Sequence, residues 1–581
     1  MRTAYPRTGH VAWSPGVADD DVRVGELGGL WGREVVVTEK VDGENTTLYR
    51  DGLHARSLDS GHHPSRAWVK GLQGRIGALI PGGVRVCGEN MYARHSIAYE
   101  ELESWFYGFS VWDGDWCLGW DETVRFLRGL GIPVPPVLWR GTYDERALRA
   151  LTLDPARQEG YVVRTVEGFV RGEFGARVVK WVRPRHVRTG THWMHAAVVE
   201  NGLGAGAALW DVRAGGAVDA GALAAAVGVE GDAAAVGEVV GRLDADGRRY
   251  GDDRLAGVLA AYLHRVPRGR LAGRLVAPLG MAQARRVADL VGLHPALHRP
   301  FPDDERRAGL ARMALAADLG VLHAVAGAVA ADAGAREQVE WSALVAEEAG
   351  LLDPEPLRAL RTGLRAELTG LVGRAGFDGL DGLRPDAVER CWAEARDAWA
   401  DGRLTSVEEA VAATWRWRDG HFPRLIQLVG PPGSGKSTFV GGLTGVGTRI
   451  SLDDLREERG GRADQRANGD VLRDGLDRLD RALAAGGTVV WDATSLNRQQ
   501  RSLVRTVARR RDAFVTYAVL LVDEAELARR NGVRPHPVPP DVLAGQLRRF
   551  VPPYPGDAHR TWYIGAGGAV EDTDAVTAGG M

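Results

Sequence analysis

The stretch 424–438, RLIQLVGPPGSGKST, sets the fold class of the C-terminal part of the chain. Its first half is an apolar run typical of a buried strand, and residues 430–437 fit the pattern G-x-x-x-x-G-K-[ST] completely. After a strand and before a helix, such glycines let backbone N–H groups wrap phosphates, while the lysine reaches the β- and γ-phosphates and the hydroxyl binds Mg²⁺. The alternative is a glycine-rich turn with a solvated lysine. The predicted nucleotide-binding residues are Gly430, Gly433, Ser434, Gly435, Lys436, Ser437 and Thr438, with Lys436 also catalytic and Ser437 the metal ligand.

Further apolar runs at 488–493 (TVVWDA) and 514–522 (FVTYAVLLV) alternate with helical patterns, which predicts an α/β domain over residues 419–581. Polar residues follow two of the predicted strands: Asp453 and Arg456 after one, Asp492 and Thr494 after another. Open α/β sheets bind their ligands at this edge. A carboxylate there can accept a proton from an attacking hydroxyl, and an arginine one helical turn further on can hold an acceptor phosphate. A helix cap with a surface ion pair is the alternative for Asp453 and Arg456.

Two arginines four residues apart, Arg530 and Arg534, suit a lid over a transferring phosphoryl group, although a solvated basic face has the same pattern. Taken in order, GPPGSGKST, DDLR, DATSLN, RNGVR and Val538-Pro539 resemble the kinase domain of phage-type polynucleotide kinases. The resemblance implies a 5′-hydroxyl kinase that uses NTP and Mg²⁺, with Mn²⁺ as the alternative metal. The roles it implies are general base for Asp453, RNA binding for Arg456, Asp492 and Thr494, nucleotide binding for Arg530, and catalysis for Arg534.

Residues 1–195 contain short strand-like runs separated by turn signals, which predicts a mainly antiparallel α+β domain. One of these runs ends in TEKVDGEN, residues 38–45, with a lysine at position 40. Of the 73 lysines and arginines in the chain only four are lysines, namely Lys40, Lys70, Lys180 and Lys436. Biased codon usage accounts for that background, but only a lysine can act as an amine nucleophile. Such an amine attacks only when part of it is neutral, so we expect burial or a neighbouring cation to lower its pKa.

An ordered series follows Lys40: HARS (54–57), CGEN (87–90), WFYGFSVWD (105–113), EGYVV (159–163) and VVKWVR (178–183). The series resembles the covalent nucleotidyltransferases, and within them the RNA ligases that join a 3′-OH to a 5′-phosphate. The resemblance departs at Val182, where the family has a second lysine that Arg183 or Arg185 would replace. It implies catalytic roles for Lys40 as the adenylated nucleophile, Glu159 as a metal ligand and Lys180 on the α-phosphate, and nucleotide binding for Glu39, Asp42, Gly43, Asn45, Arg56, Glu89 and Phe109.

Residues 196–418 are rich in Ala, Leu and Arg with helical spacing, which predicts a mainly helical central domain of unassigned role. No apolar run is long enough to cross a bilayer, and the N-terminus lacks a signal-peptide core. The three cysteines are too scattered for a disulfide framework or a zinc cluster. The net charge of −3 neither supports nor excludes nucleic acid. We therefore expect a multidomain cytoplasmic protein with no membrane partner.

The two resemblances together imply a repair enzyme that phosphorylates 5′-OH RNA ends and then seals them with ATP through Lys-AMP and RNA-adenylate intermediates. The expected partner is RNA, such as cleaved tRNA. Residues 200–415 contain no paired H-x-T/S motifs and no D-x-D-x-T signature, so we expect a separate 3′-end healing phosphatase or phosphodiesterase. Two alternatives stay open: repair of DNA nicks, and a damaged-RNA sensor or scaffold whose ligase head is weak because of Val182.

Overall fold

The computed structural model describes residues 2–17, 21–59, 61–184, 197–374, 385–459, 468–534 and 537–573, without the side chains of 304, 371–374 and 468. Their contacts form two compact units. The N-terminal unit contains Met1–Val229 and Asp244–Leu255, and the C-terminal unit contains Glu230–Leu243 and Ala256–Ala578. The expected multidomain class is confirmed: a strand-rich N-terminal domain, a helical middle and a C-terminal α/β domain. The expected boundary at 195/196 lies outside the described residues.

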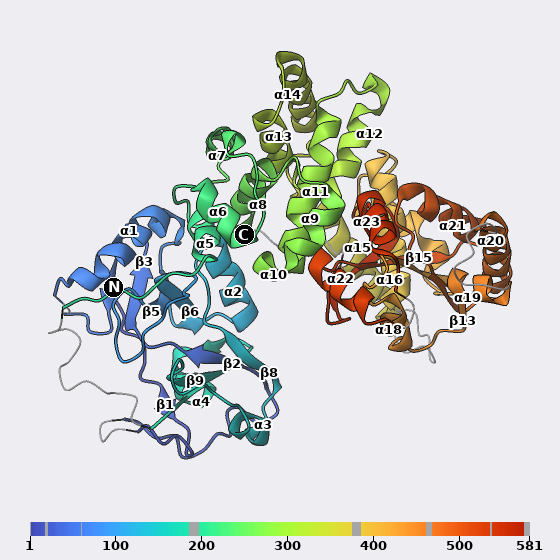
Figure 1. The fold of residues 1–581 in the computed structure, drawn as a ribbon. Helices are drawn as coiled ribbons and strands as arrows, with labels where there is room; N and C mark the ends of the chain where they lie inside the picture. Colours follow the sequence, from blue (N-terminus) through green and yellow to red (C-terminus); the bar gives the residue numbers. More distant parts are fainter. Residues whose placement is uncertain are drawn as a thin grey trace. The chain divides into compact units, whose positions relative to one another are not determined.

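The N-terminal unit is built on two sheets, of five strands in the order β1-β11-β9-β2-β8 and of six in the order β10-β7-β6-β5-β3-β4 (Figure 1). All neighbouring strands are antiparallel except the parallel pair β1 and β11. The strands are β1 Gly9–His10, β2 Glu34–Lys40, β3 Glu44–Tyr49, β4 Gly52–Ala55, β5 Val84–Asn90, β6 Phe106–Asp113, β7 Trp116–Cys117, β8 Val137–Thr142, β9 Gly160–Thr165, β10 Phe169–Val170 and β11 Val178–Val182.

The two faces of the six-stranded sheet have different partners, because successive side chains of a strand point to opposite faces. Val86 of β5 packs in a cluster with Leu72 of a covering helix, α1. Its neighbour Cys87 packs instead with Phe174 and with Val178 of the five-stranded sheet. The space between the sheets is therefore lined from both. The helices of this unit are η1 Pro64–Arg66, α1 Ala67–Ile76, η2 Gly77–Leu79, α2 Trp120–Gly129, α3 Glu145–Arg149, η3 Arg171–Glu173, α4 Phe174–Arg177, α5 Ala207–Arg213 and α6 Ala220–Val227.

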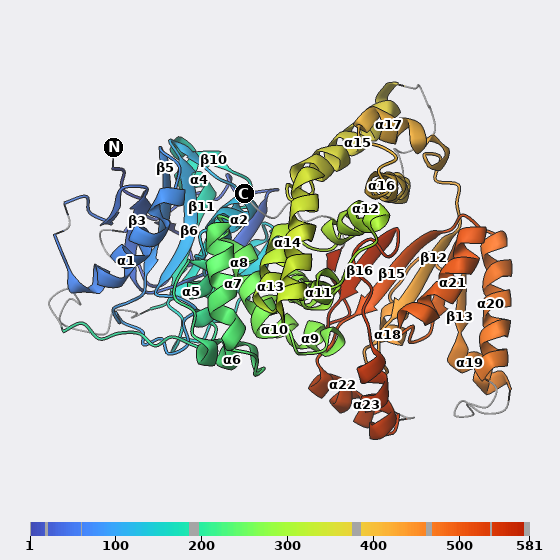
Figure 2. The ribbon, with the colours of Figure 1, turned by 90° about the horizontal axis from the view of Figure 1, so that it is seen from above.

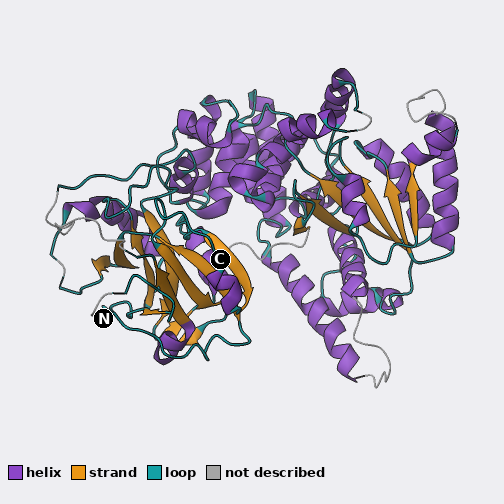
Figure 3. Cartoon of the chain, turned by 60° about the horizontal axis from the view of Figure 1, so that its bottom comes forward, coloured by secondary structure: helices purple, strands orange, loops and turns teal. Residues whose placement is uncertain are grey.

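Between β11 and the next strand, β12, the described elements are all helices (Figure 3). No single helix of the described chain has both the length and the apolar character to cross a membrane; one bent pair, Glu305–Ala314 with Leu319–Ala328, passes that test together. The helices are α7 Ala234–Ala245, α8 Gly251–Tyr262, α9 Arg268–Arg274, α10 Val276–Leu279, α11 Met281–Leu297, α12 Asp303–Ala314, α13 Leu319–Ala328, α14 Ala333–Glu348, α15 Glu355–Arg374, α16 Pro385–Ala400, α17 Val407–Ala413 and η5 Trp415–Trp417.

Within the C-terminal unit two of these helices, α9 and α11, are joined to each other and to the segment before β16 by buried polar contacts. Arg268 of α9 pairs with Asp289 of α11, donates to the carbonyls of Pro552 and Pro553, and lies 3.7 Å from the ring centroid of Tyr554. A buried guanidinium is costly unless its donors are satisfied, and here three different acceptors satisfy them. These contacts therefore fix α9 and α11 against the segment that leads into β16.

The sheet of the C-terminal unit has the order β13-β14-β12-β15-β16-β17, and only β16 and β17 are antiparallel. Leu425 of β12 packs with Leu479 and Val504 of α20 and α21, while Ile426 packs on the other face with Phe439 of α18. Figure 2 shows α20 beside α21, with α20 next to β13. The elements are β12 Arg424–Val429, α18 Lys436–Gly441, β13 Thr448–Ser451, α19 Leu452–Glu458, α20 Asn468–Ala484, β14 Thr488–Asp492, α21 Arg498–Arg510, β15 Phe514–Leu520, α22 Glu524–Gly532, α23 Pro540–Arg549, β16 Arg560–Ile564 and β17 Val570–Thr573.

Candidate active sites

A cavity of about 150 Å³ lies between the two sheets of the N-terminal unit. The five-stranded sheet contributes Thr38 and Lys40 of β2, Val162 of β9 and Lys180 of β11. Strand pairing aligns Thr38 with Val162 and Val162 with Lys180, so alternation places all of them on one face. Four of the expected nucleotide-binding residues line this cavity from the six-stranded sheet and its loops. They are Asn45, Arg56, Glu89 and Phe109.

Lys40 occupies the centre of this arrangement. Its Nζ donates to Oε2 of the buried Glu159 at 2.6 Å. Burial disfavours the ammonium, but the nearby carboxylates of Glu159, Glu89 and Asp42 outweigh burial, and the pKa of Lys40 is raised above its ordinary value. The expectation that its pKa is lowered is therefore wrong for the nucleotide-free chain. Carboxylates that hold the ammonium in place keep the amine protonated until their charge is taken up by another cation.

Glu89 and Asn45 lie directly opposite each other on β5 and β3. Burial raises the pKa of Glu89 to about 8; Lys40 opposes that rise, and Glu159 and Asp42 add to it. The side-chain Oδ1 of Asn45 is buried and has no hydrogen-bond partner among the described residues. An unsatisfied buried acceptor that faces a cavity is typical of a site shaped for a ligand. These residues fit a polar ligand that supplies the missing donor.

Phe109 reaches the cavity through a β-bulge. Cys87 pairs with Ser110 and Gly88 with Gly108, so Phe109 between them has no partner on β5. A bulge of this kind changes the direction of a side chain. The buried Arg164 of β9 fixes the bulge, since its guanidinium donates to the Phe109 carbonyl at 3.1 Å and to the Leu118 carbonyl at 2.8 Å.

Lys180 belongs to a partly buried chain of polar groups. Its Nζ donates to Asp21 at 3.3 Å, and the other carboxylate oxygen of Asp21 lies 3.1 Å from Nε2 of His10. Burial lowers the pKa of Lys180, with Lys40 adding to the effect and Asp21 opposing it. Burial, followed by Lys180, also lowers the pKa of His10 to about 4. The imidazole is therefore neutral at physiological pH, so Lys180 is the charged partner of Asp21 in this group.

The remaining nucleotide-binding candidates lie around this cavity. Glu39 lines it and accepts from Gln158 at 2.8 Å, whereas Asp42 accepts the backbone N–H groups of Ser96 and Ile97. At Gly43 a Cβ would come within 2.5 Å of the Asn90 carbonyl, so a side chain does not fit there.

The departure from the family motif is visible at the end of β11. Val182 is buried, and Arg183 is buried without being among the residues that line the cavity. Arg185 lies outside the described residues. In the described chain, Lys40 and Lys180 are the lysines of this cavity.

In the C-terminal unit, the loop after β12 has the backbone of a phosphate-binding loop. Gly433 and Gly435 adopt φ of 82° and 97°, which L side chains rarely adopt. A Cβ at Gly433 would also lie 3.0 Å from the Leu527 carbonyl of α22. Lys436 folds back on the loop and donates to the carbonyls of Gly430 and Pro431 at 2.9 and 2.8 Å. Ser437 and Thr438 follow Lys436 in the first turn of α18.

Burial lowers the pKa of Lys436 to about 8; Asp492 opposes the shift, Arg534 adds to it and Asp453 opposes it. These residues, from the start of α19, the end of β14 and the segment after α22, are therefore close enough to act on one ammonium. Asp453 pairs with Arg456 at 2.6 Å, while Asp492 accepts from Arg449 of β13 at 3.0 Å. The Thr494 carbonyl accepts the N–H of Gly430 at 2.9 Å, which brings this segment to the loop.

Arg530 lies beside the loop, since a Cβ at Gly435 would be 3.6 Å from its Nη1. Its guanidinium donates to Glu526 at 2.6 Å and to the Ala566 carbonyl at 2.8 Å. The buried Asn531 exchanges two hydrogen bonds with the backbone of Val538, of 2.7 and 3.0 Å. The motif residues RN and VP are thus joined by one side chain, which ties the segment after α22 in place.

Sequence reasoning missed several residues of these sites. Arg164 lies in the strand that follows Glu159, and an arginine in an apolar strand is itself a signal of a buried polar role. Asp21 and His10 gave no signal, because their link to Lys180 depends on the parallel pairing of β1 with β11. Arg449 could not be predicted from the sequence either, since its partner Asp492 lies 43 residues away.

Within the described residues, no group of three His, Cys, Asp or Glu side chains is arranged to hold a metal ion unaided. Oxygen donors are nevertheless available beside the expected phosphate positions: Glu159 and Glu89 in the N-terminal unit, and Ser437 with Asp492 in the C-terminal unit. Mg²⁺ and Mn²⁺ prefer such hard ligands, and Mg²⁺ is commonly held by one or two carboxylates together with substrate phosphates. The residues fit a metal that arrives with a nucleotide.

Two family models match segments of this chain. Residues 33–182 match the family model described as RNA ligase, and residues 425–553 match the model described as AAA domain. No curated protein matches the chain.

Similar solved structures include a chain of the Pnkp1/Rnl/Hen1 RNA repair complex (22% identity, 22% of this chain and 44% of that chain, TM-score 0.21). A mutant Naegleria gruberi RNA ligase with ATP and Mn has 18% identity, covers 27% of this chain and 52% of that chain, and gives a TM-score of 0.21. A gluconokinase from Sinorhizobium meliloti has 24% identity over 25% of this chain and 84% of that chain, with a TM-score of 0.19. The chain spans about half the length of the first two.

Most residues that line the cavity around Lys40 fall inside the first matched segment, and the loop that ends in Lys436 falls inside the second. The chain therefore carries an RNA ligase domain over residues 33–182 and a kinase-like P-loop domain of the AAA type over residues 425–553.

Proposed function

We propose that the chain heals and seals RNA ends. The C-terminal site transfers the γ-phosphoryl group of NTP to a 5′-OH end, and the N-terminal site joins the resulting 5′-phosphate to a 3′-OH with ATP. The observation that carries the proposal is the pairing of Lys40 with Glu159 at 2.6 Å inside a cavity that also presents Lys180, Glu89 and Phe109. This set offers an amine, phosphate-binding cations, an acid and an aromatic face, which are the groups that nucleotidyl transfer needs.

In the sealing reaction the Lys40 amine attacks the α-phosphorus of ATP. A phosphoramide bond forms, the bond to pyrophosphate breaks, and the ammonium proton passes to a neighbouring carboxylate or water. Lys180 stabilises the charge that develops on the α-phosphate. The AMP then moves to the RNA 5′-phosphate, and the 3′-OH displaces it. A divalent cation bound with ATP supplies charge neutralisation at the phosphates.

In the healing reaction Asp453 accepts the proton of the 5′-hydroxyl, whose oxygen bonds to the γ-phosphorus as the β–γ bridge breaks. Lys436 and Arg534 stabilise the charge on the transferring group, and Arg530 holds the nucleotide beside the loop. Arg456 holds the acceptor's 3′-phosphate, with Asp492 and Thr494 at the same edge. The shared electrostatic influence of Asp453, Asp492 and Arg534 on Lys436 supports this assembly.

The first test uses the full chain, α-labelled ATP and Mg²⁺, with Lys40→Ala and the matched variant Lys70→Ala. Lys70 is exposed on α1, so its loss changes the lysine count without touching the cavity. We expect a labelled band in the wild type and in Lys70→Ala, and none in Lys40→Ala. Absence of the band from wild type that has first been treated with pyrophosphate, to remove any AMP already bound, would overturn the ligase assignment. γ-Labelled ATP and a 5′-OH oligoribonucleotide test the kinase in the same way, with Asp453→Ala as the inactive variant.

The substrate is tested with matched nicks. Faster sealing of RNA than of DNA nicks supports the proposal, and the reverse supports DNA repair. Adenylation of Lys40 without any sealing supports a sensor or scaffold, for which the buried Val182 in place of a second lysine is the supporting observation. We also propose that a separate enzyme heals 3′ ends, and sealing of 2′,3′-cyclic phosphate ends by the pure protein would contradict it.

A further inference from the structure

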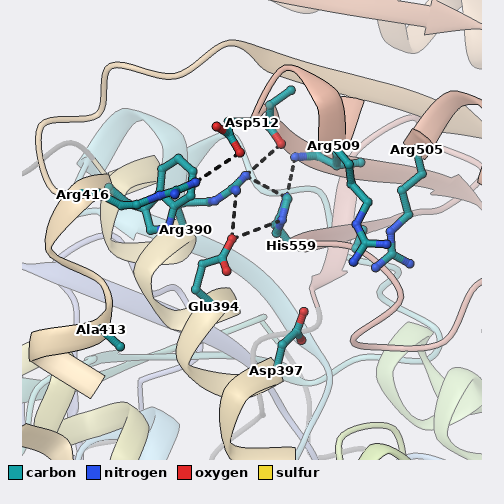
Figure 4. A pocket seen from close by; sticks show the side chains of 13 residues that line it. Arg390, Glu394, Asp397, Ala413, Arg416, Arg505, Arg509, Asp512 and His559 are labelled. Atoms are coloured by element: carbon teal, nitrogen blue, oxygen red, sulfur yellow. Dashed lines mark hydrogen bonds and ion pairs between the residues drawn. The ribbon is translucent and has the colours of Figure 1, made fainter. Parts of the chain in front are cut away.

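A second cavity, of about 370 Å³, lies in the C-terminal unit, away from the P-loop (Figure 4). It is lined by residues of α16, η5 and α21 and of the segments just before β15 and β16. Because β12, β14, β15 and β16 are parallel, the starts of β15 and β16 lie at the sheet edge opposite the P-loop. The cavity is therefore no part of the phosphoryl-transfer site.

Four arginines line this cavity, and its three carboxylates are already engaged. Glu394 pairs with Arg390 at 2.8 Å and Asp512 with Arg416 at 3.2 Å. Asp397, the third carboxylate, lies 3.2 Å from Arg396. The acids therefore neutralise other arginines, and positive charge remains on the other side of the cavity.

That positive charge belongs to Arg505 and Arg509, which lie one turn apart on α21. Neither has a hydrogen bond or ion pair to its side chain in the part of the chain that is described. Figure 4 shows both guanidinium groups on the same side of the cavity, outside the contacts that join Arg390, Glu394 and His559. Two adjacent and unneutralised guanidinium groups are a favourable site for a phosphate.

The pKa of His559 is affected by the positive charges around the cavity. Its Nδ1 accepts the N–H of Val515 at 2.8 Å. Burial holds its pKa well below the ordinary value, and Arg390, Arg396, Arg505 and Arg509 add to the effect. The same potential that disfavours a proton on the imidazole favours an anion beside it.

Two features extend the cavity into a path for a polymer. Arg498 precedes Arg505 by two turns on α21 and is exposed, so Arg498, Arg505 and Arg509 lie along one face over ~16 Å. Arg498 begins the helix that follows Asp492 and Thr494, the expected acceptor edge. At the other end, Trp415 lies in the same turn as the cavity residues Arg416 and Trp417, and 71% of its surface is exposed. Exposed aromatic rings beside a basic groove are typical of surfaces that bind single strands.

We propose that the cavity and the Arg498–Arg505–Arg509 face form a second RNA-binding site, which holds backbone phosphates of a single-stranded segment away from the reacting 5′ end and stacks a base on Trp415. The proposal rests on the proposed action on RNA. It gives the central helices, through α16 and η5, a part in holding the substrate.

The test compares Arg505→Ala/Arg509→Ala with Arg510→Ala/Arg511→Ala in the full chain. The control removes the same charge from the same end of α21, but Arg510 and Arg511 both pair with Asp480. Binding of a short and of a longer 5′-OH oligoribonucleotide is measured by fluorescence anisotropy over a range of salt, together with kinase activity on the short acceptor. Inorganic phosphate is titrated as a competitor, to separate a backbone phosphate from a free anion.

We expect the Arg505/Arg509 variant to bind the longer RNA at least severalfold more weakly. The slope of the logarithm of the binding constant against the logarithm of the salt concentration should become less steep by about 1.4, since each phosphate contact on a single strand contributes about 0.7 to it. Its kinase activity on the short acceptor should equal that of wild type, which shows that it is folded. Trp415→Ala should weaken binding of the longer RNA without changing the salt dependence of that binding.

Equal effects of the two arginine pairs, or no effect of either on the longer RNA, would overturn the second site. Competition by inorganic phosphate with unchanged RNA binding in the variant would assign the cavity to a free anion and overturn it too. Absence of kinase activity in the wild type would count against the proposed function alone, because RNA binding is measured independently of catalysis.

Discussion

Arg456 and Asp453 form an ion pair of 2.6 Å within the single short helix α19. The residue proposed to accept the 5′-hydroxyl proton is thus held by the residue proposed to bind the acceptor's phosphate. A phosphate that binds the guanidinium competes with this contact, because arginine can donate two parallel hydrogen bonds to a phosphate. Binding of the acceptor would then free the Asp453 carboxylate to accept the proton of the acceptor's 5′-hydroxyl.

This relationship separates the two residues kinetically. Asp453→Asn should lower kcat of the kinase by roughly 10²–10⁴-fold, the range of general base catalysis, with little change in KM for the acceptor. Arg456→Gln should chiefly raise KM for acceptors that carry a 3′-phosphate. Steady-state kinetics with acceptors that have or lack this phosphate measure both effects, and Arg459→Gln, at the end of α19, is the matched control. An equal loss of kcat in both variants would contradict separate roles.

The Lys40–Glu159 contact predicts a slow reaction of Lys40 with amine-directed reagents. Only four lysines are present, so acylation can be followed at each by mass spectrometry, with the exposed Lys70 as internal reference. Because the Glu159 carboxylate raises the pKa of Lys40, Glu159→Gln should increase labelling of Lys40 relative to Lys70 by about tenfold or more, the effect of removing an opposite charge at this distance.

The control for this measurement is Glu145→Gln, a change at an exposed carboxylate of α3 that pairs with Arg149. It should leave the labelling ratio unchanged. Unchanged labelling of Lys40 in Glu159→Gln would show that access rather than protonation limits the reaction.

The parts of the fold that were predictable are those whose signal is local. The strand before Gly430, the glycines that need positive φ and the lysine at the start of α18 are contiguous, so the pattern specifies both structure and site. The alternation in β2 likewise places Lys40 on the face of Thr38. Period and turn chemistry suffice in such cases.

The features that escaped prediction depend on register or on distant partners. Phe109 was expected at the site from the resemblance alone. It faces the cavity because a bulge shifts the pairing of β5 and β6 by one residue, and nothing near Phe109 in the sequence marks that shift. The raised pKa of Lys40 depends on Glu159, which is 119 residues away. In the sequence Asn531 stands between the two arginines expected to form a lid. In the structure its side chain is hydrogen-bonded to the backbone of Val538. Spacing alone carries no information about these pairings.

Lys436 predicts proton uptake when nucleotide binds to the kinase site. Its pKa of about 8 in the free chain rises when the polyanion arrives, because an opposite charge favours the ammonium. Near pH 8 about half of the lysine is neutral, so binding takes up a fraction of a proton. Calorimetric titrations of the Lys40→Ala chain with ATP, in buffers of different ionisation enthalpy, measure this uptake.

The matched variant for this experiment is Lys436→Arg, because arginine keeps the charge and does not titrate. The difference in proton uptake between the Lys40→Ala chain and the same chain with Lys436→Arg is the contribution of Lys436. A binding enthalpy that changes with buffer equally in both would assign the proton to another group.

Glu89 predicts a distinct pH dependence of the N-terminal unit. Its carboxyl holds its proton up to about pH 8 in the folded chain but only to about 4.5 when unfolded. Between these values the folded state binds more protons, so the free energy of unfolding falls as pH rises through the window. Glu89→Gln keeps the shape of the neutral carboxyl and removes the titration, so the decline of its unfolding temperature from pH 5 to pH 8 should be smaller than in wild type.

The same variant tests the role of the neutral group in catalysis. At pH 7 Glu89→Gln should retain adenylation of Lys40 within a few fold of wild type, because the wild-type side chain is already mostly protonated in the free chain, whereas Glu89→Ala should lose most of it. Glu26→Gln, an exposed site, serves as the control for the removal of one carboxyl. If Glu89→Gln instead abolished adenylation at pH 7 as completely as Glu89→Ala, the ionised carboxylate would be the required form, and ATP binding would have to displace its proton.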